Sequence, residues 1–194
     1  MSARAAGGVL ALTFAGALGL AFAHVDVLGR GGAATIAQPE TSARPAFAET
    51  RWPFLRDQWG PGRAYRCPAA LCAGEVEVFV RPKSGFCNCY GGVEDDDEID
   101  RIGDVDLHSP RFVPLAPGRP ASVGAMTGRR RAFRIDTGGA PRQVVAIVVA
   151  STCNALVAIV VSEGDLPPAV ERAVLDLLDG APVQRFIAAA SVAP

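Results

Sequence analysis

Apolar and polar residues alternate in residues 75–81 (EVEVFVR) and again in residues 131–136 (RAFRID). In the first segment Val76, Val78 and Val80 share one side, and charged residues occupy most of the other. Successive side chains of a β-strand point to opposite faces of its sheet. Both segments are therefore expected to form strands with one buried face.

Several shorter elements are predicted between these two strands. Residues 82–85 (PKSG) have the composition of a turn, so residues 86–90 are expected to return as the second strand of a hairpin. Residues 94–106 are strongly acidic and could open a short helix, because carboxylates suit a helix N-terminus. Residues 111–115 and 122–126 are candidate short strands.

Residues 143–162 are the most apolar stretch beyond the N-terminus. Two runs rich in β-branched residues flank the polar residues 151–154 (STCN). A transmembrane helix of minimum length is one interpretation. The β-branched content and the polar centre favour a hairpin of two buried strands, with Asn154 taking the positive φ that such a turn requires.

The C-terminal part of the chain predicts two helices. Residues 167–179 repeat apolar residues at helical spacing, with charged residues between them, and Gly180 is expected to end the helix. Pro182 begins a second, shorter helix. Hairpin-connected strands followed by helices indicate an α+β fold, in which a mainly antiparallel sheet carries the C-terminal helices on one face.

The N-terminus has the pattern of a hydrophobic targeting helix. Residues 7–23 carry no charge and end in Ala-Phe-Ala, so cleavage would leave His24 first. A signal anchor over residues 7–28 is the alternative, and a buried core helix is less favoured because the segment is not amphipathic. Export places the protein in the periplasm or cell envelope. Together with an Ala- and Arg-rich composition, this is typical of a bacterial protein.

The same patterns define the expected domains. Residues 1–23 are predicted to be a signal peptide or signal anchor, residues 24–50 a flexible linker, and residues 51–194 a single α+β domain. A net charge of −1 over 194 residues gives no basic field that would attract nucleic acid. The only partner indicated is the membrane, through the N-terminal segment if that segment is retained.

Five cysteines follow the targeting segment: Cys67, Cys72, Cys87, Cys89 and Cys153. In an oxidising compartment such residues are expected to form disulfides. We predict a local Cys67–Cys72 bond, and a second bond from Cys87 or Cys89 to Cys153. The spacing alone does not determine the connectivity, and one thiol is left over.

A thiol site is the alternative use of the cysteines. Four thiolates at Cys67, Cys72, Cys87 and Cys89 could hold zinc, and the Cys-x-Cys pair suits copper(I). The spacing lacks the paired C-x2-C motifs of zinc sites. The sequence also has no C-x-x-C motif, which would have indicated redox activity. We therefore expect no cofactor, with zinc or copper as the alternative.

Charged clusters offer two further hypotheses. The acidic residues of 94–106 could bind calcium, but the glycine that an EF-hand loop needs at its sixth position is missing, so a solvated loop is favoured. The cluster Arg129, Arg130, Arg131 and Arg134 could bind an anion. Because an acidic stretch lies elsewhere in the chain, a role within the protein or at its surface is favoured.

Catalytic and nucleotide-binding motifs are weak. A hydrolase would have to combine Ser122, in a sequence that lacks the leading glycine of a nucleophile elbow, with His108. The glycines at 29 and 31 follow the targeting segment instead of a strand, so they do not indicate a dinucleotide site. We therefore expect a non-enzymatic binding or accessory module stabilised by disulfides, with the thiol-based metal or redox protein as the alternative.

Overall fold

The computed structural model describes residues 44–85 and 92–191. Within these ranges the strands are β1 (Ala48–Thr50), β2 (Arg63–Cys67), β3 (Val76–Ser84), β4 (Phe112–Pro114), β5 (Arg119–Val123), β6 (Met126–Ile135), β7 (Arg142–Ser151) and β8 (Asn154–Ser162). The helices are α1 (Ala69–Cys72), α2 (Asp96–Ile102), the 3-10 helix η1 (Val105–Leu107), α3 (Pro168–Asp179) and α4 (Ala181–Ser191).

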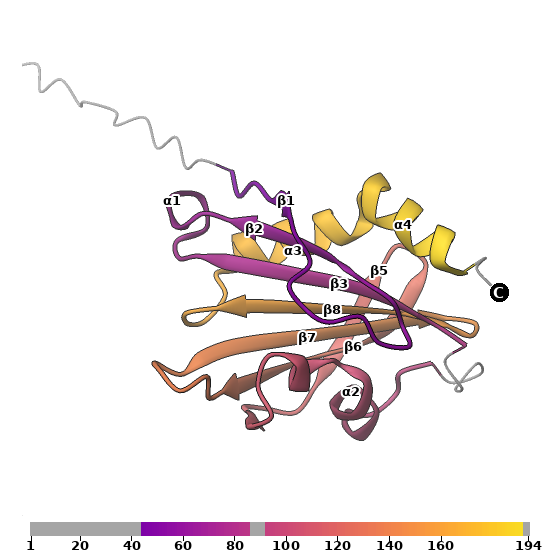
Figure 1. The fold of residues 1–194 in the computed structure, drawn as a ribbon, viewed down its shortest axis with the longest axis horizontal. Coiled ribbons are helices and arrows are strands. Elements are labelled where there is room, and N and C mark those ends of the chain that lie inside the picture. Colours follow the sequence, from indigo (N-terminus) through magenta and orange to yellow (C-terminus); the bar gives the residue numbers. More distant parts are fainter. Residues whose placement is uncertain (1–43, 86–91, 192–194) are drawn as a thin grey trace, which may run out of the picture. The chain divides into compact units, whose positions relative to one another are not determined.

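The strands form one antiparallel sheet in the order β1-β2-β3-β8-β7-β6-β4, and β5 also pairs with β6 (Figure 1). The sheet therefore places β8 beside β3, although α2 and four strands separate the two along the chain. β7 and β8 form a hairpin with Thr152 and Cys153 in its turn. This hairpin is the centre of the sheet.

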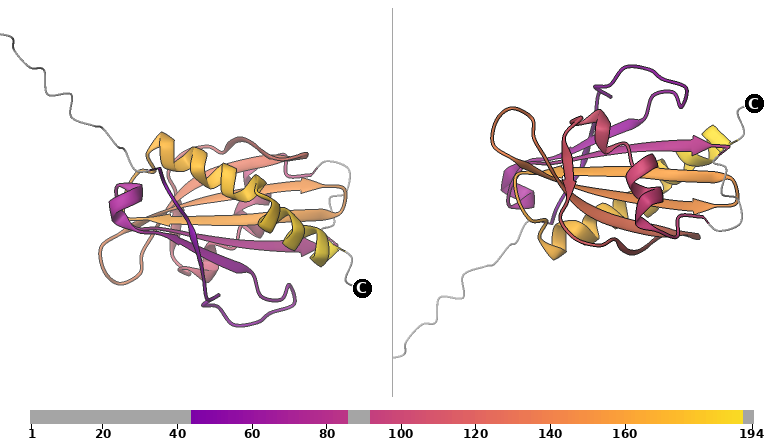
Figure 2. Two further views of the ribbon diagram at one scale, coloured as in Figure 1. Left: turned by 90° about the horizontal axis from the view of Figure 1, so that it is seen from above. Right: turned by 90° about the horizontal axis from the view of Figure 1, so that it is seen from below.

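Two hydrophobic clusters cover the two faces of the sheet. Helices α3 and α4 pack on one face, called here the α3–α4 face, and α2 lies on the other, the α2 face (Figure 2). Val145 and Ile147 of β7 point to the first face, and Val144 and Val148 to the second. Because β7 and β8 are buried on both sides, their sequence is continuously apolar instead of alternating.

The fold class predicted from the sequence is confirmed: an antiparallel sheet is followed by two C-terminal helices. The position of the helices differs in one respect. α2 packs Ile99 and Ile102 against the face opposite α3 and α4, so helices cover both faces. The predicted hairpin over residues 143–162 is also confirmed, and none of the described helices is long and apolar enough to cross a membrane.

The predicted turn at residues 82–85 is wrong, because β3 continues to Ser84. β2 pairs with β3 only over Val76–Val80, the last pair being Arg63 with Val80. From Arg81 to Ser84, β3 pairs only with β8. Pro82 lies in this one-sided part, opposite Leu156. A proline is tolerated there because its missing N–H does not interrupt a second ladder.

Two other turns differ from their predictions. The predicted strand over residues 122–126 is divided, since β5 ends at Val123 and β6 begins at Met126, with Gly124 at a φ of 56° between them. In the β7–β8 turn the positive φ, 53°, belongs to Thr152 and not to Asn154. The return strand predicted at residues 86–90 lies outside the described residues.

β1 belongs to the segment predicted as a linker, and it pairs with β2 just before the expected domain start at residue 51. The targeting segment and the proposed cleavage site lie outside the described residues. Their assignment, and the division of the chain into three parts, stay predictions.

Candidate functional site

A pocket of about 460 Å³ opens on the α3–α4 face, between β6, β7 and the first two turns of α3. Its lining combines an aliphatic floor with a few polar groups. The aliphatic residues are Val145, Ile147, Val160, Leu166 and Val174, and the polar residues include Arg119, Arg130, Gln143, Asp165 and Glu171. The floor comes from the central strands and from α3, so a rigid part of the fold shapes it.

A second pocket, of about 540 Å³, adjoins the first between β5 and α3. Its lining includes Pro120, Ser122, Pro168 and Leu175. Both pockets are lined by Arg130 and Glu171, so they meet at these two side chains. We call the two pockets together the α3 groove.

The alternation of side chains along β6 brings Arg130 to the groove. Even-numbered residues of β6, such as Met126 and Arg130, face α3, whereas Arg129 and Phe133 face α2. Arg130 forms an ion pair with Glu171 in the first turn of α3. This pair joins the helix to the sheet across the groove.

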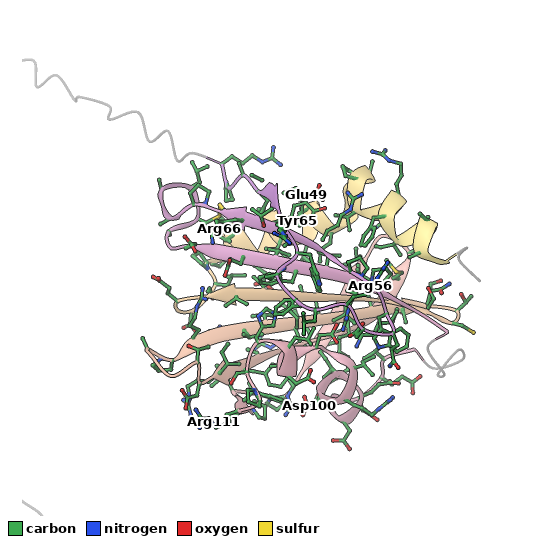
Figure 3. The ribbon with its side chains drawn as sticks, in the orientation of Figure 1. Glu49, Arg56, Tyr65, Arg66, Asp100 and Arg111 are labelled. Atoms are coloured by element: carbon green, nitrogen blue, oxygen red, sulfur yellow. A yellow bond between two sulfur atoms is a disulfide. The ribbon has the colours of Figure 1, made fainter. Side chains whose placement is uncertain are left out.

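The neighbouring arginines of β6 pair on the opposite face. Arg129 donates to Asp96 at 2.8 Å, and Arg131 donates to Asp100 at 2.7 Å; Figure 3 labels Asp100 on α2. The backbone N–H of Gly118, followed by Arg129, holds the pKa of Asp96 below its ordinary value. The predicted intramolecular role of the arginine cluster therefore fits these three residues. Arg134 is exposed.

Two charged side chains at the rim of the first pocket take no part in these ion pairs. Arg119 begins β5, and Asp165 precedes α3. Both residues are exposed. Among residues 44–85 and 92–191, neither side chain has a hydrogen bond or an ion pair. The first pocket thus offers one cationic and one anionic group to a ligand, and the exposed Arg172 lines the second pocket.

A buried charge network lies on the α2 face, away from the groove. Arg81 donates to Asp104 and, at 2.6 Å, to Asp57. Lys83 donates to Asp104 at 2.7 Å and lies 5.5 Å from the centre of the Trp59 ring. Burial raises the pKa of Asp57, but the hydrogen bonds from Arg81 and from the Trp59 N–H outweigh it, so the pKa is lowered overall. Two cations and two anions neutralise each other here, as expected of an ion-pair network that stabilises the fold.

The predicted Cys67–Cys72 pair forms a disulfide, with 2.07 Å between the sulfurs, and it encloses α1. Bonded sulfurs cannot act as thiolate ligands, so a four-thiolate metal site would require this bond to be reduced. Cys153 is disulfide-bonded as well. Cys87 and Cys89 lie outside the described residues, so the predicted pairing of one of them with Cys153 stays a prediction.

The acidic run is used inside the fold. Asp95 caps α2 by accepting from the N–H of Glu98, while Asp96, Asp100 and Asp104 pair with cations. In the described part of the chain, no three His, Cys, Asp or Glu side chains are grouped as metal ligands would be. The calcium hypothesis gains nothing from this arrangement.

The structure does not bring the two hydrolase candidates together. Ser122 is exposed on β5 and lines the second pocket. The His108 ring lies against Phe54 and Phe79 on the α2 face, with centroid distances of 4.8 Å and 4.7 Å. Burial lowers the pKa of His108 to about 4. A serine and a histidine in these positions cannot share a proton.

Sequence reasoning did not identify the groove. Arg119 lies on β5, Asp165 in the segment between β8 and α3, and Glu171 on α3, and only the path of α3 across the sheet brings them together. The amphipathic pattern of α3 was visible, but it does not specify which strands the helix leaves uncovered. No model of a known protein family matches the chain. No curated protein matches it either.

Proposed function

We propose that this protein is a disulfide-stabilised binding module of the periplasm or cell envelope, and that the α3 groove is its ligand site. The export assignment rests on the uncharged residues 7–23 and the Ala-Phe-Ala sequence that ends them. The Cys67–Cys72 disulfide is compatible with an oxidising compartment. The groove supplies the binding site.

The observation that carries the proposal is the composition of the first pocket. Ligand sites are usually concave, mostly apolar and about 300–1,000 Å³ in volume, with a few polar groups that orient the ligand. The pocket of about 460 Å³ has this size, and its aliphatic floor is bordered by Arg119, Gln143 and Asp165. These polar groups can orient a ligand over the aliphatic floor.

The experiment is to fill the pocket and measure what the protein retains. Ala132 lies half-buried in the lining, so Ala132→Trp is designed to occupy the space. Ala188→Trp adds the same side chain at an exposed position of α4 and serves as the matched control. Each protein is purified from the cell envelope under native conditions, and small molecules are identified by mass spectrometry after denaturation.

The expected result is a molecule that accompanies the wild-type protein and Ala188→Trp, and that Ala132→Trp lacks while keeping its melting temperature. Recovery of the same amount of the small molecule from all three proteins would contradict the groove as the ligand site. The intact mass tests the location: either loss of residues 1–23 or a full-length membrane-bound chain agrees with export. A full-length protein found only in the cytosol would contradict it.

A further inference from the structure

We propose that the ligand of the α3 groove is a zwitterion with an aliphatic body, of the kind found in a short apolar peptide with free termini. This inference rests on the proposed function, because it assigns a ligand class to the same site. The charges at the rim, the side chains of the floor and the size of the pocket all favour such a ligand.

The charges at the rim favour a ligand of both signs. Arg130 and Glu171 neutralise each other across the groove. The charges that remain at the first pocket are Arg119 on β5 and Asp165 in the segment before α3, one cation and one anion; Arg172 belongs to the second pocket. A carboxylate at Arg119 and an ammonium at Asp165 would each gain a charge-assisted hydrogen bond. A ligand with a single charge would leave one of these two residues without a partner.

The floor favours an aliphatic body. Val145, Ile147 and Val160 belong to the central strands, and Val174 faces them from α3. Val145 and Leu166 are half-buried and give the floor its accessible aliphatic surface, whereas Ile147, Val160 and Val174 lie almost completely buried beneath it. The lining contains no aromatic ring on which a base or a sugar could stack. Gln143 adds an amide beside this floor, which suits a peptide bond.

The experiment compares three probes that differ only in their end groups: the dipeptide Leu-Leu, N-acetyl-Leu-Leu and Leu-Leu amide. They are titrated into the full chain, purified from the envelope with labelled methyl groups, and the methyl signals of Ile147 and Val174 give Kd. We expect Leu-Leu to bind about tenfold more tightly than either blocked probe, because each blocked probe lacks one charge-assisted contact.

Two variants assign the contacts. Arg119→Gln is expected to abolish the advantage of a free carboxylate and to keep that of a free amine. Asp165→Asn is expected to do the reverse. Arg134→Gln serves as the control, because Arg134 is exposed on β6 outside the pocket lining and its loss should change no Kd.

The outcomes separate the two proposals. If none of the probes moves the Ile147 and Val174 signals, and Ala132→Trp retains the natural ligand, the groove is not a binding site and both proposals fail. If the three probes bind equally well, the groove remains a ligand site but the zwitterion is overturned. Tightest binding of N-acetyl-Leu-Leu would also overturn it, and would identify an anionic amphiphile instead.

Discussion

The guanidinium of Arg81 donates two hydrogen bonds to the carboxylate of Asp104, with N–O distances of 3.0 Å and 2.7 Å. The ammonium group of Lys83 donates to the same carboxylate and to the carbonyl oxygen of Ile102. The side chains of Arg81, Lys83 and Asp104 are at most 10% exposed. One carboxylate therefore compensates two buried cations, with Asp57 as a second partner of Arg81.

Asp104→Asn removes this compensation and keeps the shape of the side chain. Because buried charges that lose a partner are strongly destabilising, we expect the free energy of unfolding to fall by about 3–5 kcal/mol. The φ of 57° at this position suits asparagine as well as aspartate, so the backbone is not disturbed. Urea denaturation measures the change. The exposed Asp106→Asn is the control, and a loss below about 1 kcal/mol for Asp104→Asn would contradict the role of the network.

A second prediction concerns Gly62, which follows the loop that carries Trp52. A Cβ atom at this position would lie 2.5 Å from both the Trp52 ring and the carbonyl oxygen of Val80. Gly62→Ala is therefore expected to cost about 3 kcal/mol of stability and to shift the tryptophan fluorescence, because the ring must move. Gly139→Ala, where a Cβ meets nothing within 4 Å, is the matched control. Equal stability of the two variants would refute the close packing.

The lowered pKa of the buried His108 predicts that the stability of the protein depends on pH. Its pKa in the folded protein is about 4, below the ordinary 6.5, because it is buried. The unfolded chain therefore binds more protons between these values, so the contribution is present above about pH 6.5 and is lost as pH falls towards 4. The loss between pH 7 and pH 4.5 is expected to be on the order of 2 kcal/mol.

His108→Leu should remove that part of the pH dependence, as measured by urea midpoints at pH 7 and pH 4.5. Asp57 and Asp96 contribute little to this difference, since their pKa values are lowered from 3.8 and their stabilising effect is lost mainly as pH falls below that value. The nearby charges of Glu77, Asp104 and Arg142 also act on the imidazole but are smaller causes than burial. An unchanged difference between the two pH values in His108→Leu would show that other groups cause it.

The disulfide gives a fourth prediction. Cys67 and Cys72 are buried, and their bond closes a short loop around α1. A loop of this length contributes about 2 kcal/mol by restricting the unfolded chain, so Cys67→Ala/Cys72→Ala should lower stability by that amount. Peptide mapping without reductant tests the second predicted bond, from Cys153 to Cys87 or Cys89. Alkylation of Cys67 in the native protein would contradict the first bond.

The strands and helices were largely predictable because their patterns are local. The alternation in residues 75–81 and the helical spacing in residues 167–179 reflect burial of one face, which each segment carries in its own sequence. The extension of β3 through Pro82 was not predictable, because it depends on β2 ending its pairing at Val80. A proline is tolerated or excluded according to neighbours that the local sequence does not show.

The candidate site was beyond sequence reasoning for a related reason. The arginine cluster was visible, but the face to which each arginine points follows from the register of β6 with β7. That register sends Arg130 to Glu171 and Arg131 to Asp100. The charged side chains that remain without an ion pair at the groove can be identified only once the strands of the sheet are paired.

The pairing of β3 with β8 has a consequence for how the chain reaches its fold. The central edge of β3 stays open until Ser162 has been synthesised, because its partner β8 follows every other strand of the described residues. Until then Val76, Val78 and Val80 belong to a strand that lacks its main neighbour, and such edges favour association between chains. A nascent chain of this topology gains from being kept apart from its copies until the last strand is available.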